Sequence, residues 1–187
     1  MPTNRPSPEH TLCTIALAPP GVAAEADTVA LITRLVNETY GTGEAGMWRE
    51  GALRTSPEEV RALVAGGELV LAHHGDDLVG AVRVQRLPSG EAEFGMLVCR
   101  AEQQGLGVGR QLVAWVEEWA RGQGIGIMQL EVLRPRHVRH PVKEFLLSWY
   151  ARIDYHVVRK GAFEEAYPDL EPLLAVDCDF LIHHKRL

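Results

Sequence analysis

Three glycines at alternate positions, Gly105, Gly107 and Gly109, separate an apolar, β-prone run at 91–99 from an amphipathic stretch at 108–122. The apolar residues of that stretch recur at helical spacing, so the pattern predicts a strand, a glycine loop and a helix in succession. Glycine lets backbone N–H groups turn toward a ligand and lets the ligand come close. The helix N-terminus adds unpaired N–H donors and a partial positive charge. Together these features indicate a site for a pyrophosphate group.

Other phosphate-binding loops fit this segment less well. A dinucleotide fingerprint G-x-G-x-x-G requires glycine at position 110, where the chain has Arg110, and the run before it is the fourth predicted strand rather than the first. A Walker loop needs G-K-[ST], which the sequence lacks. From the glycines alone, two alternatives stay open: a tight turn without a ligand, and an enzyme that binds NAD.

Hydropathy periods divide the rest of the chain into strands and helices. Apolar residues at helical spacing predict further helices from about 25, at 57–65, at 142–152 and near 163–174. β-prone runs predict further strands at 11–18, 69–74, 78–87, 127–133, 155–159 and 178–184. The resulting order, β-α-α-β-β-β-α-β-α-β-α-β, predicts an α/β (α+β) fold in which a central mixed sheet has helices on both faces.

Length and composition narrow the class of protein. The 187 residues fit one domain, expected at 11–187, after a polar, Pro-rich tail at 1–10 that we expect to be disordered. The net charge of −6 argues against nucleic-acid and membrane partners, and no apolar run reaches the roughly 20 residues of a membrane helix. Three dispersed cysteines without a CxxC pair favour reduced thiols, no metal and a cytoplasmic protein.

At Gln104, Gly107 and Gly109 the chain matches the pattern R/Q-x-x-G-x-G/A, and it thereby resembles the GNAT superfamily of N-acetyltransferases. The order of elements matches as well, over roughly 11–187. The resemblance implies a GNAT-like fold, in which amides of the loop bind the pyrophosphate of acetyl-CoA and the backbone of the preceding strand pairs with the pantetheine arm. Cys99 and Ala101 depart from the valine and proline common in the family. The implied acetyl-CoA-binding residues are Leu97, Val98, Cys99, Gln104, Gly105, Leu106, Gly107, Val108, Gly109 and Arg110.

A second resemblance lies in the segment WYARIDY at 149–155, which is similar to the family's F-Y-x-x-x-G-F/Y. Tyr150 falls on the tyrosine, and the resemblance implies that it protonates the departing CoA thiolate. A tyrosine with a pKa of ~10 serves as an acid near neutral pH when it is held within hydrogen-bond reach. Asp154 replaces the usual glycine, so the turn after this helix is expected to differ. The alternative is that Tyr150 packs in the core with its hydroxyl at the rim.

An amine nucleophile is mostly protonated at neutral pH, so its reaction needs a proton acceptor. Strand alternation at 91–99 places Glu91, Glu93, Gly95 and Leu97 on one face. Because the resembling family often uses a glutamate in this strand, we predict Glu93 as the base, with Glu91 as second choice. Solvated glutamates at the start of a hairpin are the alternative. A backbone amide near Leu97 or Val98 is expected to hold the oxyanion.

Glu44 and Trp48 follow the first predicted helix, in a connection that commonly lines the acceptor pocket of the resembling family. A carboxylate and an aromatic ring there can hold a cationic amine, whereas core packing is the alternative for Trp48. The sequence thus predicts an acetyl-CoA-dependent N-acyltransferase that transfers acetyl directly to a small-molecule or peptide amine. The alternative is a non-catalytic acyl-CoA sensor. A homodimer is in keeping with the resemblance, and the sequence itself identifies neither the acceptor nor the preferred acyl chain.

Overall fold

The computed structural model describes residues 12–103 and 105–187, so the expected tail at 1–10 and Gln104 lie outside the described residues. One seven-stranded sheet runs through the molecule in the order β1-β2-β3-β4-β5-β7-β6. Its strands are β1 (Thr14–Leu17), β2 (Leu69–His74), β3 (Asp77–Arg86), β4 (Ala92–Cys99), β5 (Ile127–Pro135), β6 (His156–Gly161) and β7 (Cys178–Arg186). The α-helices are α1 (Ala26–Gly43), α2 (Pro57–Ala65), α3 (Val108–Gly122), α4 (Pro141–Arg152) and α5 (Phe163–Ala166). The predicted order of strands and helices is confirmed.

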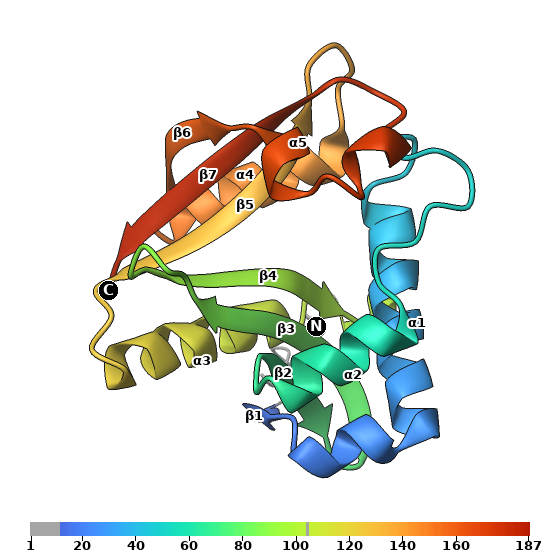
Figure 1. Cartoon of the computed structure of the whole chain (residues 1–187). Coiled ribbons are helices and arrows are strands. Elements are labelled where there is room, and N and C mark those ends of the chain that lie inside the picture. The colour runs from blue at the N-terminus through green and yellow to red at the C-terminus, as the bar shows by residue number, and fades with distance from the viewer. Residues whose placement is uncertain (1–11, 104) are drawn as a thin grey trace, which may run out of the picture.

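The sheet opens in its middle, between β4 and β5. These two strands run parallel, and their register covers only two pairs, Ala92 with Met128 and Glu93 with Gln129. Beyond these pairs the strands diverge, which separates the N-terminal half of the sheet from the C-terminal half (Figure 1). All other neighbouring strands pair antiparallel. The mixed sheet is therefore continuous at one end of β4 and β5 and open at the other.

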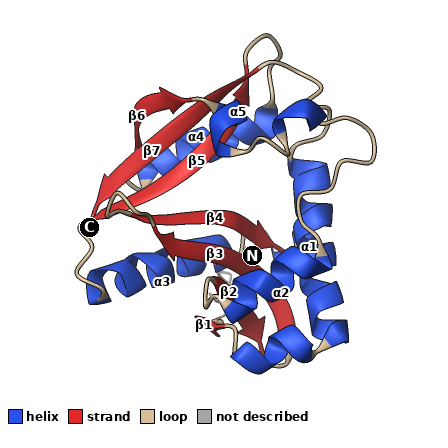
Figure 2. Ribbon diagram, viewed as in Figure 1, coloured by secondary structure: helices blue, strands red, loops and turns tan. Residues whose placement is uncertain are grey.

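Helices cover both faces of this sheet (Figure 2). On one face, Leu112 and Val116 of α3 and Tyr150 of α4 share a buried cluster with Phe94 and Leu130. On the opposite face, the apolar sides of α1 and α2 pack against the alternate residues of β2 and β3 in a second cluster. Full burial of each large apolar side chain contributes about 1.5–3 kcal/mol, so these two clusters fix the helices to the sheet. The predicted fold class is confirmed.

A bulge interrupts β4 halfway along. Arg83 pairs with Gly95 but Ala81 pairs with Val98, so β4 contains one residue more than β3 in this stretch. Met96 takes a positive φ of 51° there. The extra residue reverses the alternation, and Leu97 consequently packs against the same cluster as Phe94. The expectation that Leu97 shares a face with Glu93 is therefore wrong, because that alternation holds only up to the bulge.

Two predicted elements differ from the structure more in extent than the others, which agree to within two residues at each end. The helix expected near 163–174 is reduced to the four residues of α5 and a separate 3-10 turn at Glu171–Leu173. Pro168 and Pro172 explain this, since proline lacks the N–H that a continuing helix requires. The first strand begins at Thr14 rather than at 11. Within the described residues, none of the helices has the length and apolar character to cross a membrane.

Candidate active site

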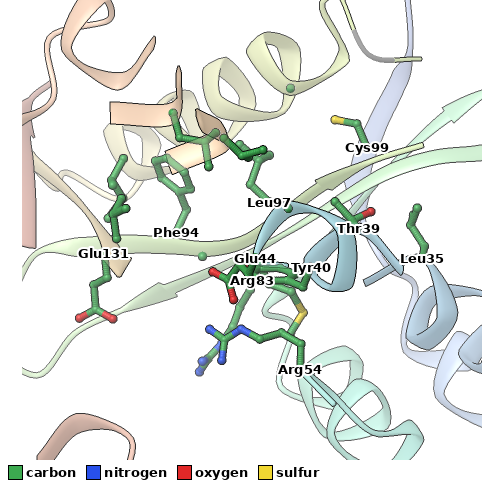
Figure 3. A pocket seen from close by; sticks show the side chains of 18 of the residues that line it. Leu35, Thr39, Tyr40, Glu44, Arg54, Arg83, Phe94, Leu97, Cys99 and Glu131 are labelled. Carbon is green, nitrogen blue, oxygen red and sulfur yellow. The ribbon is translucent and has the colours of Figure 1, made fainter. Parts of the chain in front are cut away.

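A cleft of about 2150 Å³ occupies the opening between β4 and β5. It reaches from the glycine loop and the start of α3, past β4, to side chains of β5 and of the segment after α5. Figure 3 shows Glu131 and Cys99 toward opposite ends of this cleft, with Phe94 and Leu97 between them. The cleft brings together most of the residues selected from the sequence: Leu97, Cys99, Gly105, Gly107, Val108, Gly109, Arg110, Tyr150, Glu93 and Glu44.

The glycine loop has the conformation that its sequence predicts. Gly105 and Gly107 have φ values of 83° and 87°, in the left-handed region that favours glycine. Gly107 precedes the first turn of α3, where the N–H groups have no partners within the helix. Gly109 is different, because a Cβ there would meet only Cys99 Sγ at 3.7 Å and Trp149 at 4.0 Å. Packing within the fold therefore does not require glycine at this position. Because Gly109 lines the cleft, an added side chain there would take up space in the cleft.

Among the described residues, two of the predicted cofactor residues, Val98 and Leu106, do not fall into the lining of the cleft. Val98 points away from it, into the cluster beneath α1 and α2. Leu106 is not among the described residues that line the cleft. Gln104, which carries part of the sequence pattern, lies outside the described residues. The side chain of Val98 does not line the cleft, whereas the role predicted for Val98 concerns its backbone.

Tyr150 lies on α4 with its ring buried and one edge on the cleft. Its ring packs against Trp149, Tyr155 and Phe94, with centroid separations of 4.9, 6.1 and 6.2 Å. Burial is the main cause that raises its pKa well above the usual range, so the hydroxyl stays protonated at neutral pH. Among the described residues, none forms a hydrogen bond with this hydroxyl. Tyr150 therefore offers a free O–H donor at the cleft.

Cys99 lies at the end of β4, beside the start of α3. Burial, reinforced by the neighbouring Cys13, raises the pKa of its thiol to about 11. A thiol with such a pKa is protonated at neutral pH, and the thiolate is the nucleophilic form. The cleft therefore contains a cysteine without the thiolate that a covalent acetyl intermediate requires.

Glu93, the predicted base, faces the cleft from β4 and is buried. Gln85 Nε2 donates to Glu93 Oε1 over 2.9 Å, and Gln129 Nε2 donates to Glu93 Oε2 over 2.6 Å. Glu91, the second choice, is not among the described residues that line the cleft. Its pKa is lowered, mainly by a hydrogen bond from the side chain of Ser89 in the β3–β4 turn. The geometry thus favours Glu93 over Glu91 as a group that a substrate reaches.

The structure adds two residues that sequence reasoning missed, Glu131 and Tyr167. Glu131 lies on β5 and lines the cleft, and Tyr167 OH donates to Glu131 Oε2 over 2.6 Å. Burial, followed by the charge of Glu93, raises the pKa of Glu131 to about 7. A glutamate among the apolar residues of the strand predicted at 127–133, two positions after Gln129, was the available signal, because a carboxylate in such a run is costly to bury.

Glu44 and Trp48 contact each other, since Trp48 Nε1 donates to Glu44 Oε2 over 2.5 Å. However, Lys143 of α4 forms an ion pair with the other oxygen of Glu44, and both side chains are buried. Trp48 is not among the described residues that line the cleft, and Arg54 stacks over its ring at 5.8 Å. The negative charge of Glu44 is therefore already compensated, and the structure does not form an open aromatic and carboxylate cage from this pair.

Comparison with known proteins identifies the family. A model of the acetyltransferase (GNAT) family matches residues 32–142, more than half of the chain, and this range includes most of α1, the bulged β4, the glycine loop and α3. The chain belongs to the GNAT family. The predicted resemblance is thereby confirmed, and with it membership in a family of acetyltransferases. None of the curated proteins compared matches the sequence significantly.

Solved structures share the GNAT fold at low sequence identity. The PaiA N-acetyltransferase from Thermoplasma acidophilum in complex with coenzyme A is 16% identical, with a TM-score of 0.68 over 94% of this chain and 99% of that one. A putative GNAT acetyltransferase from Desulfovibrio desulfuricans is 18% identical, with a TM-score of 0.62 over 94% and 99%. An aminoglycoside 6'-N-acetyltransferase complexed with coenzyme A is 17% identical, with a TM-score of 0.64 over 86% and 91%. At such identities the likeness shows the shared fold.

The polar groups that line the cleft include amide, phenol and carboxyl groups. In residues 12–103 and 105–187, no group of three or more His, Cys, Asp or Glu side chains is arranged to hold a metal ion. Tyr150, Glu93 and Glu131 line the cleft, and phenols and carboxyl groups are side chains of the kinds that can donate and accept protons.

Proposed function

We propose that the protein transfers the acetyl group of acetyl-CoA to the amino group of a small molecule or peptide by direct attack. The observation that carries this proposal is the position of the cleft at the opening of the sheet. Tyr150 approaches it from the face covered by α3 and α4, and Glu93 faces it from the opposite face. A thioester held between the diverging strands would have a proton donor on one side and a proton acceptor on the other.

The donor site is assigned to the backbone of residues 105–110 and 97–99. The loop amides and the N-terminus of α3 would bind the pyrophosphate, because unpaired N–H groups and the helix dipole favour an anion. The edge of β4 at Leu97 to Cys99, beyond the two residues that β5 pairs with, would pair with the pantetheine arm. An amide of this stretch would hold the carbonyl oxygen as negative charge develops on it.

Proton transfers complete the reaction. The neutral amine attacks the thioester carbonyl and forms the C–N bond, the C–S bond breaks, and Tyr150 donates its proton to the departing thiolate. The proton that the nitrogen then loses restores Tyr150 through solvent. The protonated thiol of Cys99 supports direct transfer rather than an acetyl-cysteine intermediate. A non-catalytic acyl-CoA sensor would use the same donor site without turnover.

Calorimetric titration with acetyl-CoA tests the donor site, with NAD and AMP as controls. We expect binding of acetyl-CoA alone. Release of free thiol in the presence of a panel of amines (amino acids, polyamines, an aminoglycoside and a peptide N-terminus) then tests turnover. Equal binding of all three nucleotides, or none, would refute the donor site. Binding without thiol release from any amine would favour the sensor.

A further inference from the structure

A row of polar side chains crosses the sheet at the point where β4 and β5 begin to separate. Gln85 pairs with Glu93, Glu93 with Gln129, and Gln129 with His184, so the row spans β3, β4, β5 and β7. These residues alternate with Phe94 and Leu130, which face the cluster beneath α3. The polar row therefore lies on the face of the sheet opposite Tyr150.

Both amides in this row present their NH₂ groups to Glu93. Arg83 Nη2 donates to Gln85 Oε1 over 2.9 Å, so Gln85 must present its NH₂ group to Glu93. Gln129 directs its NH₂ group to Glu93, and its Oε1 lies 2.9 Å from His184 Nε2, a contact that is a hydrogen bond in the tautomer with the proton on Nε2. Glu93 consequently accepts one amide hydrogen bond on each oxygen.

Glu131 lies two residues beyond Gln129 on β5, on the same face. Two residues before it, Gln129 pairs with Glu93, and Gly95 on β4 has no side chain and nothing within 4 Å of an added Cβ. The carboxyl group of Glu131 therefore faces this gap near Glu93, whose charge acts on it. Two neighbouring carboxyl groups repel each other when both are ionised, which favours a proton on Glu131.

The surroundings decide which carboxyl group gains and loses that proton. Glu93 is held by two amide donors, whereas Glu131 has the single hydrogen bond from Tyr167 and is less buried. The charged and titratable groups that act on Glu131 among the described residues are Glu93 from β4, Tyr167 from the segment after α5, and Arg159 from β6. Burial and Glu93 raise its pKa to about 7, against the opposing effects of Tyr167 and Arg159.

We propose that Glu131 is the general base of the reaction and that Glu93 is a positioning residue whose charge favours the accepted proton. This inference rests on the proposed function. It assigns the deprotonation of the acceptor to Glu131 in place of Glu93. A base whose proton affinity matches neutral pH is the more efficient one, and Glu131 meets that condition at the wall of the cleft.

The proton balance of the step is complete. The acceptor enters as an ammonium ion and gives one proton to Glu131, which leaves a neutral amine. Its lone pair forms the C–N bond with the thioester carbonyl, and collapse of the tetrahedral intermediate breaks the C–S bond and releases the second proton from nitrogen. The thiolate takes the proton of Tyr150, and that second proton restores Tyr150 through solvent. Glu131 returns its proton to solvent, so one proton is released per turnover.

A titration of carboxyl groups by carbon NMR, on protein with ¹³C-labelled glutamate, tests the pair without any ligand. In the wild type we expect one glutamate to titrate near 7, as burial and Glu93 imply. Glu131→Gln should remove this signal, and Glu93→Gln should move it toward the ordinary glutamate range, because the neighbouring negative charge is lost. Glu118→Gln, an exposed change on α3, is the matched control that leaves the signal in place.

Kinetics with the best acceptor of the amine panel tests the assignment of the base. Glu131→Gln should lower kcat/KM about 100-fold and abolish the limb of the pH profile that rises near 7, while calorimetry shows unchanged binding of acetyl-CoA. Glu93→Gln should keep that limb but move it to lower pH. This shift separates a positioning residue from a base.

Two results would overturn the inference while leaving the proposed function intact. The first is thiol release by Glu131→Gln at the wild-type rate and with the wild-type pH profile. The second is a wild-type protein in which no glutamate titrates above the ordinary range. A failure of acetyl-CoA to bind to the wild type would instead refute the proposed function, and the base assignment with it.

Discussion

The two faces of the sheet at its opening are built in different ways. On the face of α3 and α4, the proposed donor site consists of backbone amides, a buried phenol and a protonated thiol, without a titrating group near neutral pH. On the opposite face, the proposed acceptor site consists of side chains from β3, β4, β5 and β7 in one hydrogen-bonded network. Binding of acetyl-CoA should therefore depend on the shape of the backbone. Deprotonation of the acceptor amine should depend on the charges of the side chains on the opposite face.

The largest effect that this comparison predicts concerns Tyr150. Tyr150→Phe removes the O–H that faces the cleft and nothing else, so we expect kcat to fall about 100-fold with little change in acetyl-CoA binding. Thiol release and calorimetry measure the two quantities. A phenylalanine variant with the wild-type rate would mean that Tyr150 serves the core rather than the reaction.

Tyr155 provides a matched control within the same aromatic cluster. Its hydroxyl donates to the buried Glu117 over 2.9 Å, and it is not among the described residues that line the cleft. Tyr155→Phe should keep the wild-type rate and lose about 1 kcal/mol of unfolding free energy, because one buried hydrogen bond is removed. Opposite profiles for the two variants would confirm that only one hydroxyl takes part in the chemistry.

The second prediction separates the stability of α3 from its ligand. A Cβ at Gly109 meets only ordinary contacts in the structure, so Gly109→Ala should leave the unfolding free energy unchanged or raise it by up to ~1 kcal/mol. A pyrophosphate and its pantetheine arm would need that space, and we expect the Kd for acetyl-CoA to rise about 10-fold. Thermal unfolding and calorimetry on one preparation measure both effects.

Gly122 is the control for this prediction, because it lies at the other end of the same helix with nothing within 4 Å of an added Cβ. Gly122→Ala should give the same gain in helix stability without a change in Kd. If Gly109→Ala binds acetyl-CoA as the wild type does, the ligand does not approach the first turn of α3, and the donor site is wrongly placed.

The two faces also differ in how far the sequence predicted them. The donor site comes from consecutive residues, in which Gly105 and Gly107 mark positive φ values and the periodicity of α3 marks the helix. Such local patterns are visible without a structure. The bulge at Met96 gives no comparable signal, because a one-residue shift against β3 depends on the partner strand. This is why the orientation of Leu97 was predicted wrongly.

The proposed acceptor site could be derived from the sequence only in part, for the same reason. Glu93 was found through the resemblance, whereas its contacts with Gln129 and Glu131 depend on the parallel pairing of β4 and β5, 36 residues apart for Glu93 and Gln129. The pairing of Glu44 with Lys143 joins the end of α1 to α4 and was equally invisible. Side-chain networks between strands that are far apart in the sequence depend on the order of the strands in the sheet. The amino-acid sequence specifies that order only indirectly.

The third prediction addresses the acceptor face alone and has a smaller effect. Tyr167 OH donates to Glu131 Oε2, and this hydrogen bond favours the carboxylate form and lowers the pKa of Glu131. Tyr167→Phe should therefore move the rising limb of the pH profile to higher pH, by less than about one unit. The shift is opposite in sign to that expected for Glu93→Gln. A common direction for both variants would contradict the proposed pair.

The smallest effect links the same glutamate to stability. Because the pKa of Glu131 is raised in the folded protein, to about 7, the native state binds a proton more tightly than the unfolded chain does. Between the unfolded pKa of about 4.3 and the folded value, stability therefore falls as the pH rises, and it stays reduced above that range. A neutral amide in the same place removes this cost.

Glu131→Gln should accordingly be more stable than the wild type at pH 8, by about 2–4 °C in Tm, and the two proteins should converge at pH 4. Glutamine also keeps an oxygen for Tyr167, so the hydrogen bond from Tyr167 persists. Differential scanning calorimetry across this pH range measures the difference. A constant difference at all pH values would indicate a packing effect, whereas a gain confined to high pH shows that the carboxylate destabilises the fold at the pH where it acts as a base. The carboxylate proposed to deprotonate the acceptor would then lower the stability of the folded protein, whereas the groups of the proposed donor site would not.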